Sequence, residues 1–348
     1  MNTITINNRA VGPGHPTYMV AEMSANHNQN FDQAVAIIKA AKEAGADAVK
    51  LQTYTPDTLT INCHNEYFRI KGTLWEGRNL YDLYGEAYTP WEWQPKLKDV
   101  AGELGIELFS TPFDISAVDF LEEMNVAVHK VASFESVDLP LLRRIGQTGK
   151  PVIMSTGMAT LAEIDEAVQT LRNAGTKELV LLKCTSAYPS PPDAMNLRTI
   201  PHLAAAFDVV AGLSDHTLGI TVPVSAVTLG ACMIEKHFTV ARNLGGPDSK
   251  FSLEPAEFKA MVEAVRTVER ALGEVHYGLQ PDEEVSRVFR RSLFVVQEMQ
   301  PGDLFSAENV RSIRPGHGLH TRFLDEVIGR RASQKIERGT PLDWKYVA

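Results

Sequence analysis

One stretch of the chain decides the fold: residues 18–51, which read YMVAEMSANHNQNFDQAVAIIKAAKEAGADAVKL. The stretch begins with a short apolar run at 18–22, of the kind that forms a buried strand. From residue 31 to residue 44 the apolar side chains recur at helical spacing, and Gly45 then supplies a typical C-terminal helix signal. A second apolar run follows at 47–51. The order strand, helix, strand predicts two parallel strands joined by a crossover helix.

The same alternation continues along most of the chain. Further apolar runs are separated by helix-like segments such as 160–173 and 257–272. Eight strand–helix repeats within about 270 residues predict an α/β fold of the closed (β/α)8 TIM-barrel type. An open doubly wound sheet is the structural alternative, but no glycine-rich dinucleotide fingerprint follows the first strand. The eight predicted strands are 18–22, 47–51, 106–110, 126–131, 151–155, 179–183, 209–213 and 232–236.

Two segments depart from the repeat. Residues 62–93 form a long, aromatic insertion between the second and third strands, and an insertion of this length is often functional. Glycine, proline and an acidic pair at 273–284 indicate a linker, and beyond it short apolar runs alternate with turn signals. We therefore expect a barrel domain at 1–280, a linker at 281–290 and a compact β-rich domain at 291–348.

Composition narrows the class of partner. The chain has 348 residues, of which 44% are hydrophobic and 22% charged, as in ordinary globular proteins. Its net charge of -9 argues against nucleic acid or an anionic membrane surface as the main partner. Three widely spaced cysteines form no disulfide framework, no secretory signal opens the chain, and no apolar stretch is long enough to cross a bilayer. We expect a soluble protein of the reducing cytoplasm that acts on small molecules.

Reactive side chains occur at the end of almost every predicted strand. The chemistry of barrel enzymes takes place at the carboxyl ends of the strands, which converge on one mouth. One such residue could be a simple polar cap, but the whole set predicts an active site. Its members are Glu22, Lys50, Gln52, Thr111, Lys130, Ser133, Glu135, Ser155, Ser186, Tyr188, His216, Glu235 and His237.

Two histidines indicate a metal site. His216 and His237 follow adjacent predicted strands, and two imidazoles suit Mn, Zn, Fe or Co with positions left for water and substrate. Asp215 and Glu235 are their sequence neighbours and could orient the two rings. A purely structural role for each histidine is the alternative.

Two lysines indicate an anion site. Lys50 and Lys130 supply positive charge near several hydroxyl groups, which add directional donors. The alternative is that each lysine pairs with a core carboxylate, such as Glu22 or Glu235. We favour anion binding.

Taken in order, these motifs resemble those of the sialic acid synthase family. The resemblance covers nearly the whole chain and implies a barrel followed by an antifreeze-like (SAF) domain. It also implies a domain-swapped homodimer, in which the small domain covers the partner's barrel mouth. The matching motifs are Ala21-Glu-Met-Ser-Ala-Asn-His27, Ala44-Gly-Ala-Asp-Ala-Val-Lys-Leu-Gln-Thr53, Ser110-Thr-Pro-Phe113, Lys130-Val-Ala-Ser133, Ser155-Thr-Gly157, Cys184-Thr-Ser-Ala-Tyr-Pro189, Gly212-Leu-Ser-Asp-His216, Glu235-Lys-His-Phe238, Gly246-Pro-Asp248 and Arg314-Pro-Gly316.

The resemblance implies a condensation of phosphoenolpyruvate with an open-chain acylamino sugar. His216 and His237 would hold a divalent metal, Mn2+ in the first place and otherwise Mg2+ or Co2+, and Glu22 would transfer a proton. Glu135 and Glu235 would organise water and the lysine charges. The residues implied for phosphoenolpyruvate are Lys50, Thr111, Lys130, Ser133, Ser155 and Ser186. Those implied for the sugar are Gln52, Tyr188, Asp248 and, from the partner chain, Arg314.

Two departures and the insertion bear on which sugar is used. Ser186 and Ser249 stand where N-acetylneuraminate synthases commonly have Asn and His. The insertion at 71–93 resembles the family branch that takes a 2,4-diacetamido-2,4,6-trideoxy hexose of L-altro configuration. Aromatic residues near the mouth would suit a deoxy methyl and an extra acetamido group, so replacing Trp75 and Tyr81 by alanine should raise KM for the sugar alone. Synthases of N-acetylneuraminate or legionaminic acid are the alternatives within the same chemistry.

Two further classes compete. Lys183 ends the sixth strand, where a Schiff-base aldolase would place its lysine, and metal dependence separates the two chemistries. A structural ion pair is the reading that we prefer for Lys183. A non-enzymatic protein whose C-terminal module binds a polymer or ice is the third class, and the polar barrel mouth argues against it.

Overall fold

The computed structural model describes residues 3–348 and divides the chain into two compact units, one ending at Gly273 and the other starting at Glu274. In the first unit a parallel sheet closes into a barrel, in the order β10-β3-β4-β5-β6-β7-β8-β9. Because β10 pairs with β3, the sheet has no free edge, which confirms the TIM barrel and excludes the open sheet. The barrel strands are β3 Tyr18–Glu22, β4 Ala48–Thr53, β5 Glu107–Pro112, β6 His129–Val131, β7 Val152–Ser155, β8 Leu179–Cys184, β9 Val210–Asp215 and β10 Met233–His237.

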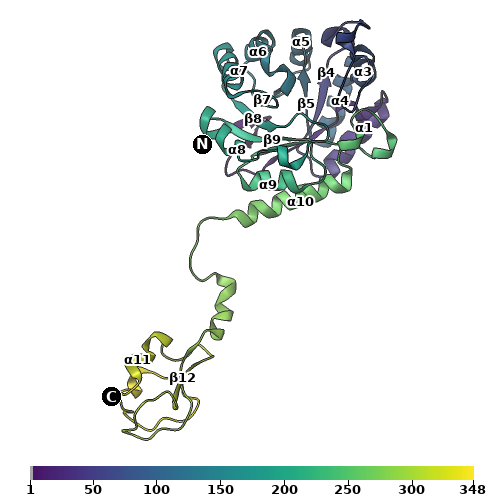
Figure 1. Cartoon of the computed structure of the whole chain (residues 1–348). Coiled ribbons are helices and arrows are strands. Elements are labelled where there is room, and N and C mark those ends of the chain that lie inside the picture. Colours follow the sequence, from purple (N-terminus) through teal and green to yellow (C-terminus); the bar gives the residue numbers. More distant parts are fainter. Residues whose placement is uncertain (1–2) are drawn as a thin grey trace. The chain divides into compact units, whose positions relative to one another are not determined.

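Helices surround the strands, as Figure 1 shows. The Thr160 hydroxyl accepts from the Glu163 N–H while the Glu163 side chain accepts from the Thr160 N–H, a capping box that starts α7. Among the described residues, no helix combines the length and apolar character that a membrane span needs. The main helices are α1 Phe31–Glu43, α4 Gln94–Leu104, α5 Ile115–Glu123, α6 Leu139–Gly146, α7 Leu161–Ala174, α8 Thr199–Phe207, α9 Thr221–Thr228 and α10 Pro255–Leu272.

Two apolar layers hold the barrel together. The outer layer lies between strands and helices and includes Val49 of β4 and Leu181 of β8. The inner layer fills the barrel and includes Ala48 and Leu182, the neighbours of those residues along the same strands. Successive strand residues therefore point alternately out of and into the barrel. A hairpin of β1 Ile4–Ile6 and β2 Arg9–Val11 adds its apolar side chains to the inner layer.

The insertion between β4 and β5 has secondary structure of its own. It contains helix α3 Leu80–Ala87 and short 3-10 turns at Glu66–Phe68 and Trp91–Trp93, and α2 Pro56–Leu59 precedes it. The ring of Trp91 packs against Phe120 of α5, with centroids 4.7 Å apart, so the end of the insertion is anchored on the barrel.

The second unit is small and has its own core. Strands β11 Ser292–Val295 and β12 Val310–Ile313 pair antiparallel, with helix α11 Leu324–Val327 beside them in the chain. Leu293, Met299 and Phe305 are among its buried core residues. The segment that we assign to a linker, 281–290, contains a 3-10 helix, η8 Pro281–Phe289, whose residues are exposed.

Candidate active site

The alternation of the strands aims the predicted residues into one mouth. Val20, Ala48 and Met233 belong to the inner layer, so Glu22, Lys50 and Glu235, two residues further along, also face inward. Counting in steps of two residues from the inner layer shows that the other predicted strand residues also face inward. These are Gln52, Thr111, Lys130, Ser155 and His237.

Four charged side chains meet at the centre of the mouth, and all four are buried. Lys50 Nζ lies 2.7 Å from a Glu22 carboxylate oxygen and 3.6 Å from Glu235 Oε1. Lys130 Nζ lies 3.7 Å from the same Glu235 oxygen. The alternative in which these lysines pair with core carboxylates is thus realised. It does not exclude anion binding, because a phosphate or carboxylate group can replace Glu22 and Glu235 as the partner of the two lysines.

Burial and neighbouring charge set the protonation of this group. Burial raises the pKa of Glu22 to about 7, although Lys50 lowers it. Burial acts in the same direction on Glu235, but Lys130 and Lys50 hold the pKa of that carboxyl below its usual range. Burial lowers the pKa of the Lys130 ammonium. The site therefore contains one firm carboxylate, Glu235, and one carboxyl that can hold or release a proton near neutral pH.

Hydroxyl groups surround the two lysines. Lys130 Nζ donates to Ser155 Oγ at 2.7 Å, and Lys50 Nζ donates to Thr111 Oγ1 at 3.2 Å. Ser133 Oγ accepts from the Gly157 N–H at 3.0 Å. The structure thus brings the residues predicted for phosphoenolpyruvate into one cluster.

Gly157 marks how tightly this cluster is packed. A Cβ added at Gly157 would lie 2.3 Å from Ser186 Oγ and 2.7 Å from Ser133 Oγ. Only glycine fits there without displacing a hydroxyl group. The sequence motif Ser155-Thr-Gly157 contained this glycine, but its role depends on two residues from other loops.

The two histidines lie side by side. Their ring centroids are 5.3 Å apart, and the Tyr188 ring packs 4.4 Å from that of His216. His216 Nδ1 is 3.1 Å from the carbonyl oxygen of Thr185, a geometry in which Nδ1 donates and Nε2 is left as a ligand. His237 Nδ1 is buried and has no hydrogen-bond partner within residues 3–348.

These features fit a divalent ion. Burial first, and then the charge of His216, hold the pKa of His237 well below its usual range, so its imidazole is neutral as a ligand must be. No group of three His, Cys, Asp or Glu side chains arranged for a metal is found in the described part of the chain. A metal here would therefore take its remaining ligands from water or substrate.

The expectation that Asp215 orients a histidine ring of the metal site is wrong. Asp215 is the last residue of β9 and lies between Ser214 and His216, so it faces the outer layer and pairs with Lys236 and Thr217 there. Glu235 faces the mouth, as expected, but its partners are the lysines and Ser214 rather than a histidine.

A cavity of about 330 Å³ opens beside His237 and is lined by both polar and apolar side chains. The predicted sugar ligands Gln52, Tyr188 and Asp248 lie on the polar side. The insertion supplies much of the apolar side, with Trp75 foremost: its Nε1 donates to Pro247 O at 3.3 Å and its ring lies 5.8 Å from that of Tyr188. Further lining residues are Ser24, Ile70, Leu83, Tyr84, Phe113, Phe134, Glu135 and His237.

Of the two insertion residues expected beside the sugar, the structure places only Trp75 there. Trp75 lines the cavity, but Tyr81 lines a separate polar hollow and donates its hydroxyl to Asp57 at 3.1 Å. Tyr84, three residues further along α3, takes the place beside the cavity that we expected for Tyr81. One helical turn separates the two positions, and the apolar periodicity of α3 does not tell which one faces the mouth.

Glu135 and Arg314 complete the predicted set. Glu135 belongs to a 3-10 turn at Ser133–Val137 and lines the cavity, and burial raises its pKa to about 7. Arg314 lies directly after β12 in the second unit, and its role toward a sugar stays a prediction.

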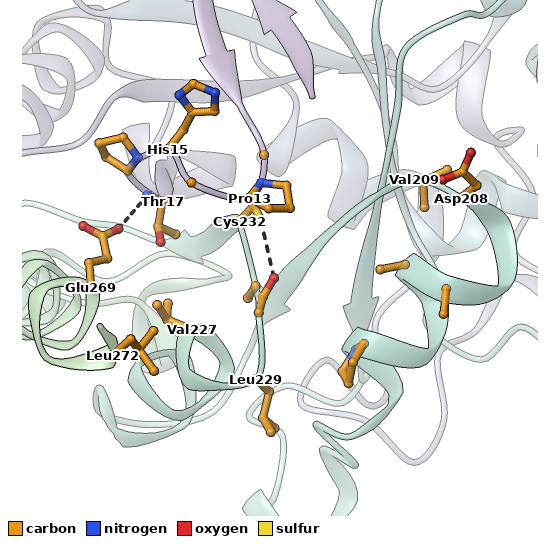
Figure 2. Close-up of a pocket in the computed structure, with 18 of the residues that line it drawn as sticks. Pro13, His15, Thr17, Asp208, Val209, Val227, Leu229, Cys232, Glu269 and Leu272 are labelled. Carbon is orange, nitrogen blue, oxygen red and sulfur yellow. Dashed lines mark hydrogen bonds between the residues drawn. The ribbon is translucent and has the colours of Figure 1, made fainter. Parts of the chain in front are cut away.

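A larger hollow lies away from this cavity. It measures about 870 Å³ and is lined by Pro13, Thr17, Cys232 and other residues at the amino ends of β3 and β10 (Figure 2). Glu269 accepts there from the Thr17 N–H at 2.6 Å. None of the residues predicted for chemistry lines it, because these stand at the opposite, carboxyl ends of the strands.

Comparisons with known proteins cover both units of the chain. The NeuB family model matches residues 37–277, and the SAF domain model matches residues 290–348. A pseudaminic acid synthase of Campylobacter jejuni is 46% identical over 93% of this chain and 95% of its own. An N,N'-diacetyllegionaminic acid synthase of Legionella pneumophila is 36% identical over 97% and 96%. The crystal structure of an N-acetylneuraminic acid synthetase from Leptospira borgpetersenii, in complex with citrate, matches with a TM-score of 0.73 and 30% identity, over 82% of this chain and 95% of that one.

Proposed function

From the premise that the chain belongs to the NeuB family, we infer that it is a pseudaminic acid synthase. It condenses phosphoenolpyruvate with 2,4-diacetamido-2,4,6-trideoxy-β-L-altropyranose and gives pseudaminic acid and phosphate. One observation carries this choice of sugar: three pseudaminic acid synthases are 45–46% identical to the chain, whereas two legionaminic acid synthases are 34–36% identical.

The charged centre fits the binding of phosphoenolpyruvate. Two buried lysines cannot remain charged without anions beside them, and in the structure Glu22 and Glu235 are those anions. Phosphate and carboxylate groups bound by Lys50 and Lys130 would take over that role, with Thr111, Ser133, Ser155 and Ser186 donating hydrogen bonds. Release from Lys50 would favour the protonated form of Glu22, whose pKa already lies near 7.

Bond formation between the two substrates requires a proton on the aldehyde oxygen of the sugar. The C3 carbon of phosphoenolpyruvate forms a bond to the aldehyde carbon of the open-chain sugar, and the aldehyde oxygen becomes a hydroxyl. Glu22 would deliver this proton, since it stands inward at the end of β3 and can hold a proton near neutral pH. Water adds to C2 and the bond between C2 and the phosphate oxygen breaks. One proton of the water leaves with the phosphate and the other replaces the proton given up by Glu22, and Glu135 and Glu235 would orient the water and the lysines.

We propose that His216 and His237 hold a divalent metal, Mn2+ in the first place. When bound, the ion supplies Lewis acidity toward the sugar's carbonyl oxygen. The neutral, partner-free nitrogen of His237 and the oriented ring of His216 support this assignment. Mg2+ and Co2+ are the alternatives. Dialysis against a chelator followed by metal analysis and readdition of each ion tests the choice directly.

The walls of the cavity fit the two halves of the sugar. Gln52, Tyr188 and Asp248 would meet its polar groups, and the aromatic side would meet its C6 methyl and acetamido methyl groups. This arrangement favours the diacetamido-trideoxy sugar over N-acetylmannosamine, whose hydroxyl groups would be desolvated there.

We further propose that a second copy of the chain covers the mouth with its SAF domain and contributes Arg314. Large apolar side chains are exposed around the rim, in the segments that follow the barrel strands, which suits an interface. They are Ile115, Phe134, Val137, Met158, Leu161 and Leu218. Mixing Arg314→Ala chains with His237→Ala chains should restore activity in about a quarter of the sites if the site is shared, and none if it is not. We also propose the reducing cytoplasm as the compartment, and the three free cysteines support this proposal.

Phosphate release tests the function. The purified chain is incubated with phosphoenolpyruvate, Mn2+ and, in parallel, N-acetylmannosamine or the diacetamido-trideoxy hexoses that lead to pseudaminic and legionaminic acids. Release with the L-altro sugar alone, abolished by chelator, is the expected result. Release with another of the sugars would keep the chemistry and replace the substrate, and release with none would refute the proposal.

A further inference from the structure

Ser24 has an unusual backbone in the sugar cavity. It follows the inward-facing Glu22 by two residues, lies 2% exposed and adopts φ 48°, in the left-handed region that residues other than glycine seldom occupy. Such a conformation persists only where the surrounding contacts hold it. The Ser24 side chain makes two of these contacts, with residues from β4 and from the loop that carries Asp248.

The direction of these hydrogen bonds follows from counting protons. Asp248 is an acceptor as a carboxylate, so the Ser24 hydroxyl donates its only proton to Asp248 Oδ2, which also accepts from the Ala25 N–H at 3.3 Å. Ser24 Oγ can then only accept, and it accepts from Gln52 Nε2 at 3.1 Å. The same Gln52 nitrogen donates to Glu22 Oε1 at 2.9 Å.

This count fixes which way the Gln52 amide points. Both of its N–H groups are engaged, by Ser24 and by Glu22, so its oxygen is turned away from them. Neither Gln52 Oε1 nor Asp248 Oδ1 accepts a hydrogen bond from the described residues, and both residues line the cavity. The polar wall therefore presents two hydrogen-bond acceptors to a ligand.

We propose that Ser24 is a positioning residue of the sugar subsite, which orients Gln52 and Asp248 so that this wall recognises the N–H and O–H donors of an acylamino sugar. The proposal rests on the proposed function, and it concerns a residue that does not itself take part in bond making. Without the hydroxyl, the Gln52 amide can rotate and present N–H groups to the sugar. Asp248 loses one of its two donors at the same time.

Two substitutions separate the hydroxyl from the backbone. Ser24→Ala and Ser24→Gly both remove the hydroxyl, but glycine favours the left-handed conformation and alanine does not. If the hydroxyl matters, both variants should raise KM for the sugar about tenfold. The KM for phosphoenolpyruvate should stay within about twofold of the parent. The thermal midpoint of Ser24→Gly should not fall below that of Ser24→Ala.

A double-mutant cycle tests whether the Ser24 hydroxyl acts on sugar binding through Asp248. In an Asp248→Ala background the Ser24 substitutions should add less than they cost alone, because the shared interaction is already lost. Full additivity would overturn the proposal, as would an equal rise of both KM values or a loss in Ser24→Ala alone. Sugar KM values equal to the parent's would overturn the proposal and leave the synthase assignment intact. A parent chain that releases phosphate with none of the sugars would overturn both.

Discussion

Truncating Trp75 to alanine should weaken the binding of the sugar and leave the binding of phosphoenolpyruvate unchanged. The indole forms part of the apolar wall of the cavity and is held there by Pro247 and Tyr188. The lysines and hydroxyls assigned to phosphoenolpyruvate are not among the residues that line this cavity. The perturbation therefore acts on one of the two substrates.

The size of the effect follows from the apolar groups of the sugar. Each methyl group that loses its contact with the indole gives up about 0.8 kcal/mol of hydrophobic stabilisation. The deoxy sugar offers its C6 methyl and an acetamido methyl, so the loss is about 0.8 to 1.6 kcal/mol. This corresponds to a rise of about 4-fold to 15-fold in KM for the sugar.

Steady-state phosphate release, with one substrate varied and the other saturating, measures both KM values. Tyr81→Ala is the matched control, because Tyr81 belongs to the same insertion but lines a different hollow. Trp75→Phe keeps an apolar ring and loses the hydrogen bond to Pro247, so it should fall between the parent and Trp75→Ala. An equal rise in both KM values, or an equal effect of Tyr81→Ala, would refute the reasoning.

Three further predictions concern Gly157 in the anion cluster, the carboxyl group of Glu135, and Lys183, the lysine that an aldolase would use. Gly157→Ala should raise KM for phosphoenolpyruvate about tenfold or more, since its Cβ would lie 2.3 Å from Ser186 Oγ; an unchanged value would remove Ser186 from the anion site. Burial raises the pKa of Glu135 from 4.5 to about 7, so its contribution to stability is complete below pH 4.5 and is lost as the pH rises through 7. Glu135→Gln should therefore be more stable than the parent at pH 8, by more than about 1 kcal/mol in denaturant melts, and lose this advantage at pH 5; a constant difference would contradict the shift. Lys183 lies two residues after the outward-facing Leu181 and donates to Cys184 O at 2.6 Å, so it should not take part in the reaction. Lys183→Met should therefore keep kcat within about threefold, and borohydride with pyruvate should leave the parent chain unmodified. Trapping of pyruvate on Lys183 would support the aldolase instead.

Many residues of the site could be predicted from the sequence, because side chains of a strand alternate between its two faces. Glu22, Lys50 and Lys130 end predicted strands, and any closed barrel turns such positions toward one mouth. The same rule, applied strictly, would have placed Asp215 on the face opposite to His216 and removed it from the set. It would also have placed Lys183 beside Leu181 on the outer face, against the aldolase.

Contacts between distant segments were beyond reach of the sequence. Ser24 stands in a quoted motif, but its partner Asp248 is 224 residues away, and no periodicity relates a loop after β3 to one after β10. The choice between Trp75 and Tyr81 depends on how an irregular insertion folds back onto Pro247. In both cases the side-chain direction is set by tertiary packing and by the satisfaction of buried polar groups.

The sequence by itself thus determined the barrel, the inward residues of its strands and the chemistry of their side chains, because strand and helix periods are local properties that hydrophobic burial enforces. Only the tertiary structure decided which hydroxyls meet at Gly157, how Ser24 orients Gln52 and which insertion residue faces the sugar. These features arise when closure of the barrel brings together loops from separate repeats, and the contacts between such loops have no period that a sequence could display.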